Sequence, residues 1–326
     1  MPILHIVNGD STRQGLERSS IPGTFCSWSD VLHEGPAPAS ASPEEWRRIR
    51  VAHLVSEGYG SPGDIENQYA REDAALERWR DHDEVVLWFE HDLYDQLILI
   101  KHLAWLGAHG ASAAVRPKLS LVCDDTYLGP LQPQQFPSLF ALREPITSAQ
   151  IELGSRAWTA VCAEDPRPLV ALASTESREL PFLSGALRRY LEEFPSTANG
   201  LTRSEQGILA ILAEGERSPA ELFGALTRTE ERIFMGDVTF WAIVKRLNRG
   251  PHPLVTLDVR ERAGTLPSGT VRITDTGRDV LAGRADQIAL NGIDRWKGGV
   301  HLTSSHCWRW DGTTLSIADC GLPTAD

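Results

Sequence analysis

The residues best suited to chemistry in this sequence follow a continuous apolar run. Residues 84–89, Glu-Val-Val-Leu-Trp-Phe, are typical of a strand buried on both faces. Glu90, His91 and Asp92 follow at once. Residues two apart in an extended chain point the same way, so Glu90 and Asp92 can both reach one cation. Because Mg²⁺ and Mn²⁺ accept carboxylate oxygens as ligands, the pattern predicts a divalent-metal site, with His91 as a candidate catalytic residue.

A helix is expected directly after this turn. Apolar residues from Leu93 to Ala104 recur at three- and four-residue spacing, which indicates an amphipathic helix. A buried strand, a charged turn and a helix form half of a βαβ unit, and open α/β sheets bind ligands at that turn. Tyr94 and Gln96 are therefore candidate substrate contacts. The alternative is structural: Asp92 caps the helix, and Glu90 is solvated.

The first expected strand, residues 3–8, ends in a second polar turn. Its last residue, Asn8, is followed by Gly9, Asp10 and Ser11. Asp10 is a further candidate ligand for the metal ion. Asp10 or Ser11 could also cap a short helix, whose free backbone N–H groups attract an anion. Asn8, Gly9 and Ser11 are therefore candidate substrate-binding residues for a phosphate group.

The same Gly-Asp-Ser run allows a different chemistry. It resembles the nucleophile block of the SGNH esterases, in which the serine attacks an ester. Serine catalysis needs a general base and an oxyanion hole. That family takes them from Asp-x-x-His and Gly-x-Asn-Asp motifs, which residues 100–200 lack. A serine esterase using Ser11 is therefore a weaker alternative.

Two more polar turns complete the pattern. The expected strand 24–28 leads toward His33 and Glu34, which are candidate proton-transfer residues. The expected strand 119–123 leads into Asp124. Because strands alternate with helices, we expect an α/β fold with a small, Rossmann-like parallel sheet and the polar turns along one edge. The sequence has neither a Gly-x-Gly-x-x-Gly dinucleotide fingerprint nor a Walker nucleotide-binding motif.

The pattern of the chain changes after the sheet. Helical patterns fill residues 146–200, which end in the linker-like run Pro-Ser-Thr-Ala-Asn-Gly. Three amphipathic helical patterns and two strand patterns then describe a winged helix. We expect four parts: a Rossmann-like α/β domain (1–145), a helical connector (146–200), a winged helix-turn-helix domain (201–286) and a docking tail with a hairpin (287–326).

The winged helix introduces a second kind of function. Its third helix carries Thr239, Lys245 and Arg246, residue types with which recognition helices contact DNA. However, residues 201–286 carry 12 basic and 12 acidic side chains, and residues 1–200 carry 17 basic against 28 acidic ones. Because DNA-binding proteins usually show a clear basic face, packing or protein contact is the favoured role of this region.

The composition of the chain indicates the cellular compartment in which the protein folds. The 326 residues carry a net charge of −12, and the five cysteines are scattered without a Cys-x-x-Cys pair. This cysteine pattern disfavours structural zinc and a disulfide framework and indicates a reducing cytoplasm. No apolar run approaches the roughly 20 residues of a membrane span, so no membrane partner is expected.

Four phrases of the sequence together resemble one bacterial family. They are residues 5–11 (His-Ile-Val-Asn-Gly-Asp-Ser), 30–36 (Asp-Val-Leu-His-Glu-Gly-Pro), 90–96 (Glu-His-Asp-Leu-Tyr-Asp-Gln) and 294–302 (Asp-Arg-Trp-Lys-Gly-Gly-Val-His-Leu). In these phrases the chain is similar to the domain-of-unknown-function family 1835 with its C-terminal companion domain. The resemblance implies the domain order given above and implies no activity.

The tail contributes one more candidate, Arg295. A planar guanidinium can bind an oxyanion through two hydrogen bonds, so Arg295 is a candidate phosphate contact. The alternative is that the tail joins the domains through Trp296, Trp308 and Trp310.

Together these patterns predict a divalent-metal-assisted hydrolase or transferase that acts on a phosphate-containing ligand, such as a nucleotide or a nucleic-acid end. Its cofactor would be Mg²⁺ or Mn²⁺. The competing interpretation is a non-catalytic winged-helix regulator or ligand sensor that binds DNA or a protein partner.

Overall fold

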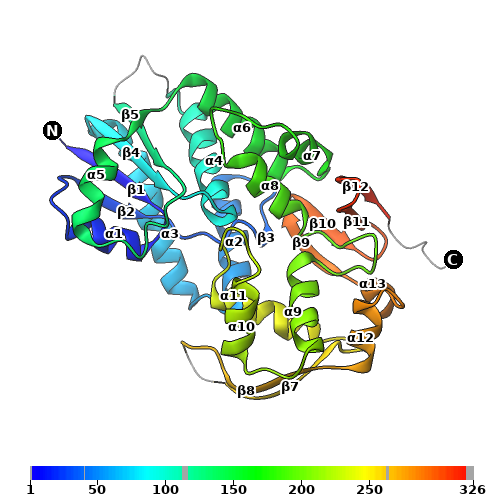
Figure 1. The fold of residues 1–326 in the computed structure, drawn as a ribbon. Helices are drawn as coiled ribbons and strands as arrows, with labels where there is room; N and C mark the ends of the chain where they lie inside the picture. The colour runs from blue at the N-terminus through cyan, green and yellow to red at the C-terminus, as the bar shows by residue number, and fades with distance from the viewer. Residues whose placement is uncertain (1, 40, 112–116, 262–263, 321–326) are drawn as a thin grey trace.

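A five-stranded sheet forms the centre of the N-terminal half of the chain. The structure is a computed structural model that describes residues 2–39, 41–111, 117–261 and 264–320. The sheet has the order β2-β1-β4-β5-β6 (Figure 1), with four neighbouring parallel strands and an antiparallel β6 at one edge. Its strands are β1 (Ile3–Val7), β2 (Thr24–Ser27), β4 (Glu84–Phe89), β5 (Lys118–Cys123) and β6 (Glu144–Pro145). The prediction of an α/β fold is confirmed, and four strands of the sheet are parallel as expected, whereas the antiparallel β6 was not predicted.

The central strand β4 is apolar from Val85 to Phe89, and its place in the sheet explains this pattern. Every one of its residues is buried. Val85 and Leu87 pack in the core on one face of the sheet, whereas Val86 and Trp88 pack in a second core on the other face. Because successive side chains of a strand alternate between the two faces, burial on both sides favours apolar residues at successive positions, and the buried Glu84 at the start of the strand is instead paired with Arg143.

Helices cover both faces of the sheet. One face packs against α4 and α6, and the other packs against α1 and α5 (Figure 1). The helices of this half are α1 (Asp10–Glu17), α2 (Pro43–Glu57), α3 (Pro62–Glu77), α4 (Leu93–Ala108), α5 (Phe136–Ala141) and α6 (Ser148–Cys162), with the short 3-10 helices η1 (Trp79–Asp81) and η2 (Pro133–Gln135). Two further helices, α7 (Arg167–Ala173) and α8 (Leu183–Leu191), extend this layer, and α8 packs against α4.

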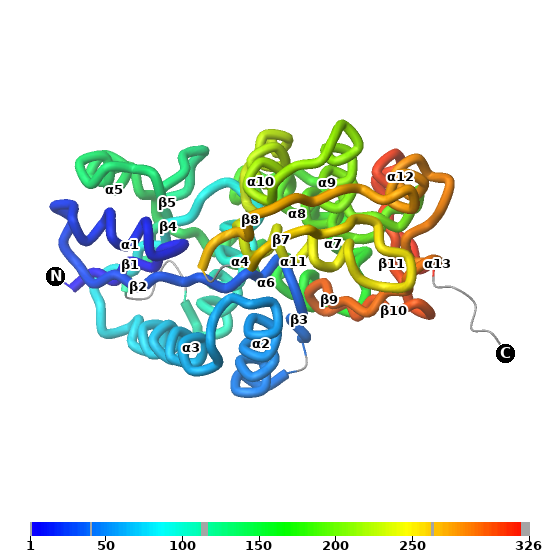
Figure 2. The backbone as a smooth tube through the Cα atoms, turned by 90° about the horizontal axis from the view of Figure 1, so that it is seen from below, coloured from blue at the N-terminus to red at the C-terminus, as the bar shows by residue number. Residues whose placement is uncertain are grey.

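A second group of elements has its own hydrophobic core. It contains α9 (Arg203–Ala213), α10 (Pro219–Thr227), α11 (Asp237–Leu247), the antiparallel pair β7 (Val255–Arg260) and β8 (Ser268–Ile273), and α12 (Asp275–Leu281). Capping boxes start α9 at Thr202 and α10 at Ser218, where a hydroxyl and a glutamate three residues later satisfy backbone N–H groups reciprocally. The third helix, α11, packs against α2 (Figure 2).

The C-terminal segment returns to the N-terminal half. It contains α13 (Gln287–Asn291) and two hairpins, formed by β9 (Asp294–Gly298) with β10 (Val300–Thr303) and by β11 (Trp308–Asp311) with β12 (Ser316–Asp319). Strand β9 pairs with the short strand β3 (Gly35–Pro36), which Figure 2 shows beside it. At the turn of the first hairpin Gly298 has φ 59°, a left-handed conformation that favours glycine. Among the described residues, no helix combines the length and the apolar character that a membrane span requires.

Candidate functional site

Three acidic side chains gather where β4 ends and α4 begins. Glu90, Asp92 and Asp95, hereafter the carboxylate cluster, each present an oxygen within 4.8 Å of the others. All three are buried, with exposed fractions of 5%, 3% and 1%. This is the carboxyl edge of the parallel sheet, where the sequence places a ligand site.

Local hydrogen bonds hold the cluster in place. The Asp92 carboxylate caps α4 by accepting a hydrogen bond from the Asp95 backbone N–H at 3.0 Å. The Asp95 carboxylate in turn accepts from the Glu90 backbone N–H at 2.7 Å. The Gln96 side-chain amide donates to the Glu90 carbonyl at 2.7 Å. The strand end is thereby tied to the first turn of the helix. The capping alternative for Asp92 is confirmed, but Glu90 is buried and not solvated.

Residues that follow the two neighbouring strands, β1 and β5, donate further hydrogen bonds to the Glu90 side chain. The Asn8 side chain, directly after β1, donates to Glu90 Oε1 at 2.7 Å and to Asp95 Oδ2 at 3.1 Å. The Leu128 backbone N–H, in the loop after β5, donates to the same Glu90 oxygen at 2.7 Å. The amide oxygen of Asn8 is buried and has no hydrogen-bond partner among the described residues. An amide fixes its oxygen and nitrogen close together, so this unpartnered oxygen is a candidate for a further ligand beside the cluster.

The charges of the cluster are not balanced by ion pairs, although the charge of Arg232 partly offsets the rise in the pKa of Asp92. No lysine or arginine in the described part of the chain forms an ion pair with any of the three carboxylates. Burial raises the pKa of Glu90, and burial together with the charge of Glu90 raises the pKa of Asp92 to about 7. The pKa of Asp95 is raised well above its usual range by burial and by the charges of Asp92 and Glu90. The cluster must therefore hold protons or bind a cation near neutral pH.

A polar cavity of about 450 Å³, hereafter the arginine cavity, lies beside the cluster. Its lining includes His91 and Leu93, which flank Asp92 in the chain, and the arginines Arg188, Arg189, Arg203 and Arg232. Arg189 and Arg203 form ion pairs with glutamates. Arg188 and Arg232 instead donate to backbone carbonyls at 3.5 and 3.4 Å, and neither has a carboxylate partner among the described residues. Two guanidinium groups are therefore available to an anion.

The histidine of the turn belongs to this cavity. The His91 ring lies 4.7 Å from the Tyr127 ring and 5.9 Å from the Phe182 ring, between centroids. Its Nδ1 is buried without a hydrogen-bond partner among the described residues. Burial and the charge of Arg232 lower the pKa of His91, so the ring is neutral at pH 7.

Asp10 is not part of the carboxylate cluster. It is exposed, accepts a hydrogen bond from the Ser27 hydroxyl at 2.9 Å and pairs with Arg13 at 3.1 Å. The expectation that Asp10 or Ser11 caps α1 is wrong, because Gly9 occupies the N-cap position without a side-chain hydrogen bond. Gly9 has φ 155°, and the chain turns there, so Asn8 faces the cluster while Asp10 faces β2. Ser11 is exposed, and no hydrogen bond links it to a histidine in the described ranges.

His33 and Glu34 lie in a different environment. Glu34, Arg246 and Lys297, hereafter the junction network, are joined by ion pairs of 3.4 Å to Arg246 and 3.7 Å to Lys297. Burial alone would raise the pKa of Glu34, but these two cations lower it far below its usual range. Burial lowers the pKa of His33 to about 4, and neither of its ring nitrogens has a hydrogen-bond partner among the described residues. Neither side chain lines the arginine cavity.

The remaining candidates are also dispersed. Tyr94 packs against the His33 ring, with 6.2 Å between centroids. Arg295 donates to the Glu205 carboxylate at 2.8 Å, on α9. Gln96 supports Glu90, as described above. The structure therefore brings together Asn8, Glu90, Asp92 and Gln96, with His91 in the arginine cavity beside them, and leaves the remaining candidates elsewhere.

Sequence reasoning places Asp95 at the polar edge of the sheet without making it a metal ligand, and it misses Arg188 and Arg232. A signal for Asp95 exists: it lies three residues after Asp92 in the first helical turn, and residues three apart share a helix face. No local pattern distinguishes Arg188 or Arg232, because their place beside the turn depends on how α8 and the loop after α10 fold back on it.

Comparison with models of known protein families gives no match for this chain, and comparison with curated proteins gives none either. The resemblance to family 1835 therefore stays a prediction, and support for a function comes from the site itself.

Proposed function

We propose that this protein is a divalent-cation-dependent hydrolase or transferase that acts on a phosphate-containing substrate, such as a nucleotide or a nucleic-acid end. The carboxylate cluster would hold the cation, and Arg188 and Arg232 would contact the phosphate. The observation that carries this proposal is that three buried carboxylates approach within 4.8 Å while no base of the described chain pairs with them. A divalent cation would supply the missing charge.

The spacing of the oxygens suits such an ion. Opposite oxygens around Mg²⁺ are about 4.2 Å apart, twice its bond length, and those around Ca²⁺ are about 4.8 Å apart. The cluster oxygens lie within 4.8 Å of one another, and because at most one pair of three ligands can be opposite, the carboxylates would move inward to bind Mg²⁺ or Mn²⁺, whose adjacent ligand oxygens are about 2.9 Å apart. When bound, the ion would polarise a phosphoryl oxygen or lower the pKa of a water molecule.

The neighbouring side chains divide the other tasks. Arg232 donates to the His91 carbonyl and stacks over the Phe182 ring at 5.2 Å, which fixes its guanidinium beside the turn. A guanidinium matches the geometry of phosphate oxygens. His91 is the proposed proton acceptor, because it lines the arginine cavity and its lowered pKa leaves it neutral. Glu34 is unsuited to that role, since its two cations keep it ionised.

Contacts of α11 give less support to the DNA-binding alternative. Arg246 pairs with Glu34 and with Glu57 at 3.6 Å, and the Thr239 hydroxyl hydrogen-bonds to the Tyr59 hydroxyl. These side chains, which a recognition helix would use for DNA, contact the N-terminal half instead. We propose that residues 201–286 form a winged helix whose third helix serves packing.

Calorimetric titration with MnCl₂ tests the proposal. Wild-type protein should bind Mn²⁺, and a Glu90→Gln/Asp92→Asn variant should lose at least about tenfold in affinity, because each substitution removes a charged ligand. Asparagine remains a good helix cap, so the variant keeps the start of α4. Asp165→Asn, which changes a half-buried acidic residue paired with Arg167, is the matched control and should bind like wild type.

Catalysis is tested separately, with p-nitrophenyl phosphate and bis(p-nitrophenyl) phosphate as monoester and diester probes. Mn²⁺-dependent release of nitrophenol should fall in Arg232→Met and His91→Ala, while Mn²⁺ affinity stays unchanged. Equal Mn²⁺ affinity of the wild type and the double variant would refute the metal site. Metal binding without hydrolysis of either ester would count against the enzyme.

A further inference from the structure

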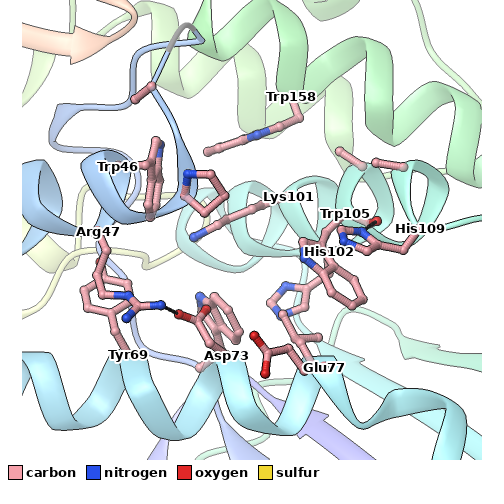
Figure 3. Close-up of a pocket in the computed structure, with 16 residues that line it drawn as sticks. Trp46, Arg47, Tyr69, Asp73, Glu77, Lys101, His102, Trp105, His109 and Trp158 are labelled. Carbon is pink, nitrogen blue, oxygen red and sulfur yellow. Dashed lines mark hydrogen bonds and ion pairs between the residues drawn. The ribbon is translucent and has the colours of Figure 1, made fainter.

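A second cavity, of about 650 Å³, lies among α2, α3, α4 and α6 and is lined largely by aromatic rings (Figure 3). Figure 3 shows the indoles of Trp46, Trp105 and Trp158 around Lys101, with Asp73 and Glu77 on the side of α3. We call it the tryptophan cavity. Its volume lies within the range of small-molecule sites, roughly 300–1,000 Å³. It shares no lining residue with the arginine cavity.

Lys101 is the charged group of this cavity. Its ammonium lies 3.8 Å from the centroid of the Trp46 ring and 4.9 Å from that of Trp28. Its nearest carboxylate oxygen is Asp30 Oδ2, at 3.8 Å, which is beyond hydrogen-bonding distance. The other Asp30 oxygen is occupied by Arg50, whose guanidinium donates to it at 2.7 and 3.2 Å. One buried carboxylate thus serves two cations.

Close to the Lys101 ammonium, positive charge is not fully balanced by acids, although the exposed Glu77 also lines the cavity. Glu72 is the other acid close to Lys101, but burial raises the pKa of Glu72 to about 8, so it is largely protonated near neutral pH. Asp73, at the mouth, is paired with Arg47. Burial lowers the pKa of Lys101, so its charged form lacks stabilisation that a bound anion would supply.

Two buried polar atoms beside Lys101 lack partners. Trp28 Nε1 and His102 Nε2 have no hydrogen-bond partner among the described residues, and both side chains line the cavity at 2% and 1% exposure. His102 Nδ1 lies 2.8 Å from the Ile98 carbonyl, so Nδ1 carries the proton and Nε2 is an acceptor. The cavity thus offers an ammonium within aromatic walls, and two polar atoms without partners in the described chain are buried in the side chains beside it.

We propose that the tryptophan cavity binds a small planar aromatic carboxylate, with its ring among the indoles and its carboxylate on Lys101. Indole faces stack with flat rings, and a charge-assisted hydrogen bond from the ammonium would fix the orientation. The site is separate from the carboxylate cluster, because Lys101 follows Asp95 on α4 by six residues, roughly 9 Å along the helix. It does not depend on the function proposed above.

The test uses three probes that share the naphthalene ring system and differ in charge: 1-naphthoate, 1-naphthamide and 1-naphthylmethylamine. Binding is followed by quenching of tryptophan fluorescence and by calorimetry on the full chain. Naphthoate should bind at least about tenfold more tightly than the neutral amide and the cationic amine. Equal or tighter binding of either of these would overturn the proposal, as would no naphthoate binding up to about 1 mM.

Two variants assign the binding to this cavity. Lys101→Met should abolish the preference for naphthoate and leave the affinity for naphthamide unchanged, whereas Lys118→Met, at an exposed lysine of β5, should bind like wild type. Trp158→Leu, at a half-buried position, should weaken all three probes and keep their order. Unaltered naphthoate affinity in both Lys101→Met and Trp158→Leu would place the binding elsewhere and refute the site. Far-ultraviolet circular dichroism checks that each variant is folded.

Discussion

The carboxylate cluster and the junction network bury acidic groups to the same depth with opposite consequences. Glu90 and Glu34 each have an exposed fraction of 5%. The pKa of Glu90 is raised by burial, whereas Arg246 and Lys297 overcome the effect of burial and lower the pKa of Glu34. Neighbouring charges and not depth therefore decide the state of a buried carboxyl group.

This difference separates a structural site from a binding site. In the junction network, the charge of Glu34 is balanced by cations of the same chain. The network joins the loop before β3 to α11 and β9, both of which lie more than 200 residues later in the sequence. The carboxylate cluster is satisfied by hydrogen bonds but not by opposite charge. A buried, unbalanced cluster destabilises the fold unless something binds to it, which is the physical reason to look for a ligand there.

Removing the acid of the balanced site should have the largest effect. Glu34→Gln removes the carboxylate that Arg246 and Lys297 share and leaves them only the more distant acids, such as Glu57 at 3.6 Å from Arg246, so the free energy of unfolding at pH 7 should fall by about 3 kcal/mol in urea denaturation. Glu44→Gln, at an exposed glutamate, should change it by less than about 0.5 kcal/mol.

The pH dependence provides a second readout for Glu34. Because its pKa in the folded protein lies below its usual value, its contribution is present above about pH 4.5 and is lost as the pH falls below that value. The wild type and the Gln variant should therefore converge in stability toward low pH. A constant difference between them from pH 7 to pH 3 would show that packing, and not charge, makes Glu34 important.

Removing a charge from the unbalanced site should stabilise the protein. The pKa of Asp92 is raised to about 7 in the folded state, so wild-type stability should fall as the pH rises from about 4 to about 7. In the presence of EDTA at pH 8, Asp92→Asn should gain about 1–2 kcal/mol over the wild type, because the variant has no charge to bury there. At pH 4 the two should be equally stable.

Mn²⁺ should reverse this order by binding the folded wild type, which raises its melting temperature but not that of the variant. A loss of stability in Asp92→Asn at pH 8 with EDTA would mean that the carboxylate is compensated in the folded protein. The contrast with Glu34 would then disappear.

The sequence predicts the position of the unbalanced site much better than that of the balanced one. The apolar run 84–89 and the helical spacing after Leu93 are local patterns, and they suffice to place Glu90 and Asp92 at a strand end. The partners of Glu34 are different. Arg246 and Lys297 belong to α11 and β9, and no local pattern relates them to residue 34 before the chain folds. A role in proton transfer was therefore a reasonable prediction for Glu34 from the sequence, and the environment that disfavours it could not be foreseen.

Neighbouring residues at one strand end show a finer limit. Asn8 and Asp10 were both expected at the edge of the sheet, and both lie there. Only Asn8 reaches the carboxylate cluster, because the turn at Gly9 directs Asp10 toward Ser27. Sequence spacing identifies the edge, but the direction of each side chain depends on backbone angles that a glycine leaves open.

Asp10 accordingly provides the smallest and most selective test. Its side chain is 68% exposed and its ion pair with Arg13 is solvated, so Asp10→Asn should change the free energy of unfolding by no more than about 0.5 kcal/mol. The Mn²⁺ affinity of the Asp10→Asn variant should equal that of the wild type in calorimetry, because the third carboxylate of the cluster belongs to Asp95 and not to Asp10. An approximately tenfold loss of Mn²⁺ affinity would instead make Asp10 a ligand, as the sequence predicts. The exposed Asp10 and the buried carboxylates of this edge would then bind the metal as one site. Burial without a counter-charge would then no longer explain why this site, and not the junction network, binds a ligand.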